Sequence, residues 1–536
     1  MKTIFFGGKI LTMNNQSPVA NALVIENNKI LALGPYDDLM KTYRPDRLVD
    51  LQGKTLLPGF NDSHMHLLGF GQSLQLCRLE GTRSIDDLKL KVKRFIQSTN
   101  DTWIRGRGWN QDHFLEKRLP TAKDLDQIEA HKPVVLNRTC GHILVCNSAA
   151  LKIAGITSDT LQPVGGAFDV DDQGHPNGIL RENAMDLVQK HFPDPTEESL
   201  SSAILAGAEY ALSQGITSVQ SDDLCVYPLK FSRLIIETFR KMSLQGHLPV
   251  RVNEQALFRT PENLKAFIAS GYKTGQGNAF YSDGPLKILA DGSLGARTAY
   301  LSQPYADAPQ ETGIPMYEQS VLDDMVMTAQ KHGIATAIHA IGDGTIDMAL
   351  DAIEKAQKSF PNPQLRSSIV HFQITRPEHF ERMNTLNVLA HIQPIFIDYD
   401  MSIVSNRIGE DRMASTYVWR TMLEKGVKMA FGSDCPVEPL DIMPNIYSAV
   451  TRKTLSGMPK GGWMPHEKLD VGTVLKAFTL WGAYASCEEN IKGSLEPGKL
   501  ADFALLDKNP YEVDPDDILK INVVETWVDG KKVYQK

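Results

Sequence analysis

The sequence predicts an α/β fold, a (β/α)₈ TIM-like barrel with a small additional β-sandwich domain, and three observations support this prediction. Short apolar runs alternate with stretches of helical periodicity through the middle of the chain, as in a parallel sheet with crossover helices. There are eight such runs, the number of strands in a closed barrel. Both ends of the chain instead carry hairpin signals, and one long gap interrupts the alternation after the first run.

Each end of the chain contains a predicted β-hairpin. The pair Asn27-Asn28 separates two apolar segments near the start, and Asp529-Gly530 separates two near the end. These residue types tolerate the positive φ angles that a tight turn requires. Neither end is long enough to bury a core of its own. We therefore predict that residues 1–56 and 489–536 combine into one small β-sandwich domain.

The barrel itself is predicted over residues 57–488. Segments between the runs, such as 201–213 and 322–332, have apolar residues at helical spacing and end near glycine. The predicted strands are 55–60, 215–219, 249–253, 286–289, 335–338, 368–370, 388–392 and 427–431.

The gap after the first predicted strand, residues 71–200, is much longer than a crossover connection needs. It contains strand-like segments of its own at 102–109 and 133–138. We interpret it as an inserted subdomain or lid.

Composition limits the cellular context. The chain of 536 residues is 42% hydrophobic and 22% charged, which is typical of globular proteins. The sequence contains no stretch of about 18 consecutive apolar residues, so no membrane span is predicted. The first residues break too early for the apolar region of a signal peptide, so we expect a cytoplasmic protein.

Cysteine usage and charge narrow the possible partners. The six cysteines contain no Cys-x-x-Cys pair, which disfavours a zinc knuckle and a disulfide framework. The net charge of −8 comes without a basic cluster, so no nucleic-acid partner is expected. A small-molecule substrate is therefore the expected partner. The sequence leaves the oligomeric state open, with a homodimer as one option.

Residues that could bind a metal lie where the predicted strands end, which is where barrel enzymes place their active sites. His64 and His66 follow the first run, and residues two apart in an extended chain point to the same side. Lys287 lies within the fourth run. His339, His371 and Asp434 follow the fifth, sixth and eighth runs.

Each of these residues has an ordinary explanation when taken alone. A histidine at a strand end is often a hydrogen-bonded structural residue, Asp434 could cap a helix, and Lys287 could pair with a carboxylate. Together they would require independent coincidences on separate strands. Because imidazole and carboxylate groups suit Zn²⁺ and related ions, the pattern predicts a metal centre.

Seven longer segments carry a family resemblance: 57–66, 103–110, 178–184, 286–298, 339–343, 431–436 and 493–503. They resemble the amidohydrolase superfamily, and more narrowly amidohydrolase family 3, the YtcJ-like branch that includes N-substituted formamide deformylase. The resemblance covers essentially the whole chain.

The resemblance implies a ligand arrangement. His64 and His66 would bind the more buried metal together with Asp434, and the second metal would be bound by the histidines at positions 339 and 371. Lys287 would be carboxylated by CO₂ and would bridge two Zn²⁺ ions. One ion beside an unmodified lysine is the alternative, and Fe or Mn are alternatives to zinc.

The resemblance also implies an activity, hydrolysis of a non-peptide C–N bond in an N-acyl or N-formyl amide by a metal-activated hydroxide. Asp434 would accept the proton and pass it to the departing amine. Weaker candidates for substrate binding are His142 in the insertion and Asp291 and Arg297 beside the loop after the fourth strand. A surface histidine and a structural ion pair explain these three residues equally well.

Two other functions remain as alternatives. A mononuclear deaminase of a heterocyclic amine normally has a glutamate after a strand-end histidine, whereas His339 is followed by Ala-Ile-Gly-Asp. A non-catalytic amidohydrolase-like scaffold would be expected to lose metal ligands, whereas all six candidates are present.

Overall fold

The computed structural model describes residues 1–140 and 142–536, which form two compact units. One unit comprises Met1–Phe70 together with Gly207–Lys536, and the other comprises Gly71–Ala206. The larger unit contains the barrel and a sheet built from both chain ends.

The barrel is an eight-stranded parallel sheet in the order β19-β18-β17-β16-β15-β14-β13-β6. Its edges meet where the Asp434 N–H donates to the His64 carbonyl (2.8 Å) and the His66 N–H donates to the Cys435 carbonyl (2.7 Å). The sheet is therefore a nearly closed TIM barrel. The strands are β6 (Phe60–Met65), β13 (Ile216–Ser221), β14 (Arg251–Leu257), β15 (Tyr281–Leu289), β16 (Thr336–Ala340), β17 (Ser368–His371), β18 (Leu389–Ile392) and β19 (Met429–Phe431).

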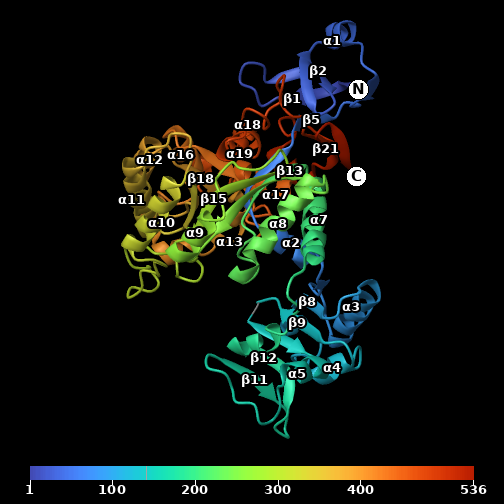
Figure 1. Cartoon of the computed structure of the whole chain (residues 1–536), viewed down its shortest axis with the longest axis vertical. Coiled ribbons are helices and arrows are strands. Elements are labelled where there is room, and N and C mark those ends of the chain that lie inside the picture. Colours follow the sequence, from blue (N-terminus) through green and yellow to red (C-terminus); the bar gives the residue numbers. More distant parts are fainter. Residues whose placement is uncertain (141) are drawn as a thin grey trace. The chain divides into compact units, whose positions relative to one another are not determined.

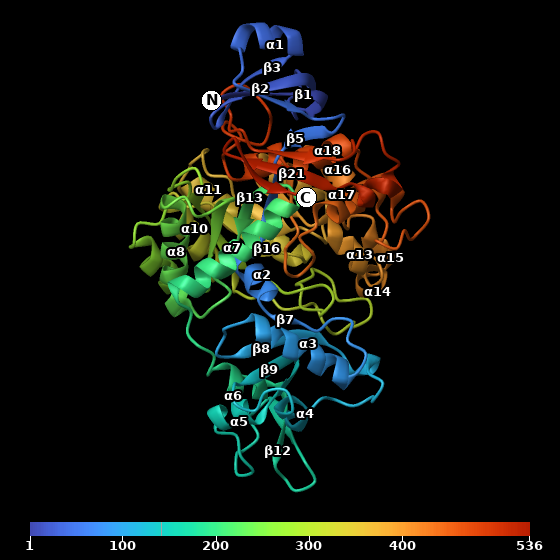
Figure 2. The same cartoon turned by 90° about the vertical axis from the view of Figure 1, so that its right-hand side faces the viewer.

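Helices connect the strands and lie outside them, as α8, α10 and α11 do in Figure 2. In α11, residues Ile346, Ala349, Leu350 and Ile353 are buried at the spacing of one helix face. Within the described residues, no helix combines the length and apolar character needed to cross a membrane. The helices are α2 (Leu67–Leu74), α7 (Glu197–Ser213), α8 (Ser232–Leu244), α9 (Pro261–Ile268), α10 (Gln319–Lys331), α11 (Asp343–Ser359), α12 (Pro377–Thr385), α13 (Ile397–Asp400), α14 (Val404–Ile408), α15 (Glu410–Met413), α16 (Trp419–Glu424), α17 (Ile442–Thr451), α18 (Val471–Ala477) and α19 (Leu480–Ala485).

One predicted strand boundary is wrong. The apolar run 55–60 is divided at Gly59, because β5 (Thr55–Pro58) belongs to the terminal sheet and β6 begins at Phe60. A Cβ at Gly59 would lie 2.2 Å from the Thr217 hydroxyl oxygen, so only glycine allows this close passage between the two sheets. His64 consequently lies within the first barrel strand and His66 just beyond it.

The two ends of the chain form one further sheet, in the order β22-β21-β20-β5-β1-β2-β3, with β4 paired to β1. Figure 1 shows strands from the blue N-terminal end near β21 from the red C-terminal end. Both predicted hairpins are present. All these strands belong to one sheet, so a two-sheet sandwich stays a prediction. The elements are β1 (Lys2–Leu11), β2 (Val19–Glu26), β3 (Lys29–Gly34), α1 (Tyr36–Tyr43), β4 (Arg47–Asp50), β20 (Phe503–Leu506), β21 (Val523–Val528) and β22 (Lys531–Gln535).

The terminal sheet is tied to the barrel by a buried ion pair. The Arg251 guanidinium on β14 donates two hydrogen bonds to the Asp502 carboxylate, at 2.6 and 2.9 Å. Both side chains are almost fully buried. Loss of one partner would leave an uncompensated buried charge, which makes this junction a determinant of the unit's integrity.

The smaller unit has its own six-stranded sheet, in the order β11-β12-β10-β9-β8-β7. Two apolar clusters, one including Trp109 and the other including Trp103, form its core. Its elements are β7 (Cys77–Arg78), α3 (Ile85–Ser98), β8 (Ile104–Trp109), α4 (Ala122–Asp126), β9 (Val134–Arg138), β10 (Ile143–Cys146), α5 (Ser148–Ala154), β11 (Gly166–Val170), β12 (Pro176–Glu182) and α6 (Asp186–Gln189).

Candidate metal centre

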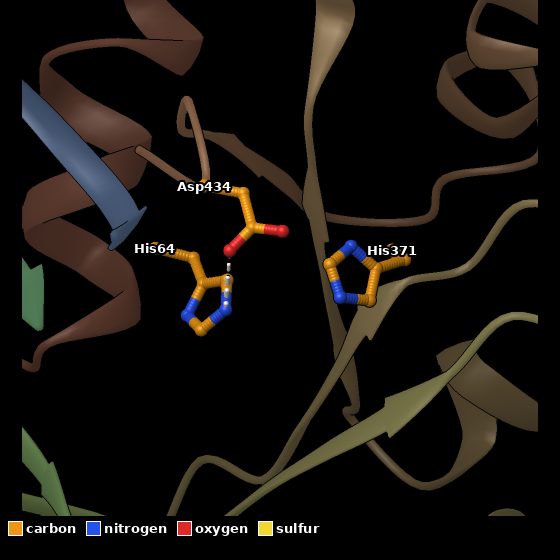
Figure 3. Close-up of side chains that lie close together, drawn as sticks. All are labelled: His64, His371 and Asp434. Atoms are coloured by element: carbon orange, nitrogen blue, oxygen red, sulfur yellow. Dashed lines mark ion pairs between the residues drawn. The ribbon is translucent and has the colours of Figure 1, made fainter. Parts of the chain in front are cut away.

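The predicted ligands lie together at the carboxyl ends of the barrel strands. The Nε2 atom of His64 is 3.0 Å from Lys287 Nζ and 3.4 Å from Asp434 Oδ1. His66 Nε2 is 3.2 Å from the same carboxylate oxygen. Figure 3 shows the Asp434 carboxylate between the rings of His64 and His371, and the ligand atoms of these three residues all lie within 4.8 Å of one another.

His339 lies at the side of this group. Its ring centroid is 4.4 Å from that of His371, and the two rings meet edge to face. The structure therefore brings all six residues from the sequence pattern into one cluster, although they come from five different strands or strand ends.

Two glutamines orient the buried histidines. His64 Nδ1 is 2.9 Å from Gln255 Oε1, and His371 Nδ1 is 2.8 Å from Gln393 Oε1. The side-chain nitrogen of each glutamine donates to a backbone carbonyl at 3.3 Å, which defines the orientation of each amide. Because the amide oxygen only accepts, each Nδ1 carries the proton and each Nε2 keeps its lone pair.

The other two histidines are oriented by backbone carbonyls. His66 Nδ1 donates to the Asp222 carbonyl at 2.5 Å, so Nε2 is the nitrogen that faces Asp434. Nε2 donates to the carboxylate when the ring is protonated and offers a lone pair to a cation when the ring is neutral. His339 has the opposite arrangement, because its Nε2 lies 2.9 Å from the Gly292 carbonyl and Nδ1 keeps the lone pair. Each of the four imidazoles thus has one nitrogen available as a metal ligand.

Burial sets the charges of the centre. It lowers the pKa of His64 and of His371 well below the usual value, so both rings are neutral, the form that binds metals. Burial alone would raise the pKa of Asp434, but the hydrogen bond with His66 and neighbouring positive groups bring it below its ordinary value. Burial likewise opposes protonation of His66, yet its contact with Asp434 raises the pKa of His66. The site therefore stabilises positive charge beside Asp434.

A buried carboxylate oxygen without a hydrogen-bond partner is further evidence that a cation fits this site. Asp222 Oδ1 is buried and has no hydrogen-bond partner among the described residues. The other oxygen of this carboxylate is 3.7 Å from Lys287 Nζ, and both side chains are only 1% exposed. Imidazole nitrogens and carboxylate oxygens in this number are a donor set for Zn²⁺ or a related divalent ion. The residues present fit such an ion.

Four residues of this centre were not identified from the sequence: Asp222, Cys225, Gln255 and Gln393. Asp222 and Gln393 directly follow β13 and β18, and Gln255 lies near the end of β14. Applying the strand-end criterion to the second, third and seventh runs would have found these three. Cys225 Sγ lies 3.4 Å from His66 Nδ1. Because that nitrogen already donates to the Asp222 carbonyl, Cys225 contacts the side of the His66 ring that faces away from Asp434.

Two of the predicted substrate-binding residues make structural contacts. The buried Asp291 carboxylate accepts backbone N–H groups of Tyr300, Ile341 and Gly342, at 2.9 to 3.1 Å. Arg297 pairs with Asp307, at 3.0 and 2.8 Å, in a structural ion pair. A substrate contact by either residue stays a prediction.

The third predicted substrate-binding residue, His142, belongs to the smaller unit. Its Nδ1 atom lies 2.9 Å from Glu182 Oε2, and both side chains are exposed. Its contact with substrate also stays a prediction.

We expect the substitution Gln393→Leu to weaken divalent-metal binding by at least about tenfold, because His371 would lose the partner that orients its ring. Metal affinity can be measured by competition with a chromogenic chelator. Gln173→Leu, at an exposed turn of the smaller unit, is the matched control. An unchanged affinity in Gln393→Leu would show that this glutamine has no orienting role.

Comparisons with known proteins identify a family whose sequence model matches most of this chain. A sequence model of the amidohydrolase family matches residues 47–534. The chain is 32% identical to the putative amidohydrolase YtcJ of Bacillus subtilis over 548 aligned positions, which cover all of both chains. It is 26% identical to N-substituted formamide deformylase of Arthrobacter pascens, over 99% of this chain and 98% of that one.

A solved structure is also similar over nearly the whole length. It is described as an uncharacterised metal-dependent hydrolase from Pyrococcus horikoshii OT3, with 30% sequence identity and a TM-score of 0.80. The similarity covers 96% of this chain and 99% of that one.

Proposed function

Because the chain belongs to the amidohydrolase family and is a hydrolase of carbon–nitrogen bonds, we propose that its substrate is an N-acyl or N-formyl amide, cleaved at the metal centre described above. The family itself suggests a divalent metal. The observation that carries the proposal is the convergence of the His64, His66 and His371 imidazoles on the Asp434 carboxylate, with the His339 ring beside that of His371.

We assign the ligands in two sets. His64, His66 and Asp434 would hold one ion, His339 and His371 the second, and Lys287 lies beside both sets. Zn²⁺ is the ion we expect, with Fe or Mn as alternatives. When bound, such an ion lowers the pKa of water towards neutrality and polarises a carbonyl group.

Asp434 is positioned to transfer the proton. Both neighbouring imidazoles approach its Oδ1 atom, and no described residue is hydrogen-bonded to Oδ2. Because its pKa is below the ordinary value, the group is an anion that accepts a proton from the attacking water. The water oxygen bonds to the acyl carbon, and the C–N bond breaks when the nitrogen receives a proton. Asp434 then returns the proton to the leaving nitrogen, so the products are a carboxylic acid and an amine.

Lys287 is the residue that we propose to be carboxylated. Its Nζ atom is buried, 3.0 Å from His64 Nε2 and 3.7 Å from Asp222 Oδ2. Addition of CO₂ to the neutral amine forms an N–C bond and releases one proton. Bound cations would stabilise the carbamate anion, so metal binding and carboxylation should occur together.

A substrate panel combined with metal analysis tests the function. N-acylated and N-formylated amines and amino acids are incubated with the dialysed protein, and free amine is measured. We expect amine release from at least one member and about one or two divalent ions per chain. One tight ion with release of ammonia from a heterocyclic amine would indicate a deaminase instead. Absence of bound metal and of turnover would indicate a non-catalytic scaffold.

A further inference from the structure

A pocket of about 410 Å³ opens at the carboxyl ends of β13 and β14, within the larger unit. One wall is the loop 224–229, which follows β13. The other wall consists of Leu257, the last residue of β14, Arg259 in the loop that follows it, and Asn263 in the first turn of α9. The pocket is thus at the end of the barrel that carries the candidate metal centre.

Cys225 connects this pocket to the centre. It lines the pocket, and its Sγ atom lies 3.4 Å from His66 Nδ1 and 3.3 Å from the Asp222 carbonyl. The opposite nitrogen of the His66 ring is 3.2 Å from Asp434 Oδ1. A single imidazole ring therefore separates the pocket wall from the proposed catalytic carboxylate.

The pocket wall is chemically distinctive. Leu224, Val226 and Leu257 supply apolar surface, and Arg259 is the one charged residue among those lining the pocket. Arg259 is exposed. Among the residues that the structure describes, no carboxylate forms an ion pair with it. Asn263 adds a side-chain amide beside it. An apolar wall with one unneutralised guanidinium is complementary to an apolar group that bears a carboxylate.

We propose that this pocket binds the amino-acid part of the substrate, so that preferred substrates are N-acyl or N-formyl derivatives of apolar amino acids. The Arg259 guanidinium pairs with the substrate carboxylate, and the substrate side chain packs against the leucine and valine wall. This inference rests on the proposed amide hydrolysis. Water then converts the substrate into a carboxylic acid and a free amino acid.

A matched pair of substrates isolates the carboxylate. N-formylphenylalanine and N-formylphenethylamine share the phenylethyl group and the amide, and differ by the carboxylate alone. We expect the wild-type protein to have a kcat/KM at least about tenfold higher for the acid, the size of one charge-assisted hydrogen bond. Arg259→Leu should abolish this preference. Arg259→Lys should restore part of it, because lysine keeps the positive charge but lacks the paired N–H donors of the guanidinium. Equal kcat/KM values in the wild type, or a preference that survives in Arg259→Leu, would overturn the inference.

Arg420→Leu is the matched control, since Arg420 is an exposed arginine on α16 that pairs with Glu424. It should keep the wild-type preference. Thermal melting of each variant checks that folding is unchanged.

A binding measurement separates the two proposals. The probe 3-phenylpropionate has the apolar group and the carboxylate but no amide bond, and its dissociation constant can be measured by calorimetry. We expect Arg259→Leu to weaken its binding by at least about tenfold. If no amide is hydrolysed but this binding depends on Arg259, the proposed function fails and the pocket assignment stands. If amides are hydrolysed and binding is indifferent to Arg259, the pocket assignment alone is wrong.

Discussion

Replacing Asp434 with asparagine is expected to lower kcat by about a thousandfold, because the amide cannot accept the proton that the carboxylate accepts. The substitution is nearly isosteric. Asp434 has a positive φ of 59°, which asparagine also tolerates, so the backbone of the strand-end turn should be kept. The effect therefore reports on chemistry at the carboxylate.

The measurement is steady-state turnover of the best amide in the panel, together with bound metal per chain. Metal retained with turnover lost indicates proton transfer as the main role of Asp434, and loss of both indicates its role as a ligand. The control is Asp86→Asn, at a highly exposed side chain paired with Lys89 in the smaller unit. A variant Asp434→Asn with a kcat within about tenfold of the wild type would contradict the assignment.

The substitution Lys287→Ala is expected to lower turnover by at least about a hundredfold, as loss of a metal-bridging group should. The amine lies 3.0 Å from His64 Nε2 in a fully buried position, so no other lysine can replace it. Bound metal should fall in parallel. Short carboxylic acids added to this variant should restore part of the rate if the lysine is carboxylated, since they supply the missing oxygen ligands.

Lys265→Ala removes an exposed lysine that pairs with Asp324, and it should leave turnover unchanged. Near-normal rates in Lys287→Ala would remove this lysine from the centre. A large loss of rate without any rescue by carboxylic acids would favour an unmodified lysine beside the metal.

Much of the barrel could be predicted because its signals are local. Alternation of apolar runs and helical segments located every barrel strand. The predicted position of the first strand was too early in the sequence, because the chain passes from the terminal sheet to the barrel at Gly59. That passage depends on Thr217, which is far away in the sequence, so no local pattern could reveal it. Turn residues such as Asp529 likewise indicated the terminal hairpins, since their backbone preferences are properties of single residues.

The candidate ligands could be predicted for a related reason. In a parallel barrel all strands end at the same face, so a residue's position relative to its own strand indicates that it faces the site. Asp222 and Gln393 occupy the same kind of position as His339 and His371, after the second and seventh runs. They were not identified from the sequence, and both are within hydrogen-bond or ionic reach of the predicted ligands.

The sequence by itself determined the fold class, the family resemblance and the set of ligand-type side chains, because these follow from residue type and short-range spacing. Only the tertiary structure decided which nitrogen of each imidazole is free, since the partners of His64 and His371 lie on other strands. It also decided that Arg297 pairs with Asp307 and that Arg259 faces a pocket beside Cys225. Hydrogen bonds and pocket walls form between segments that meet only after folding, and their geometry depends on how those segments pack.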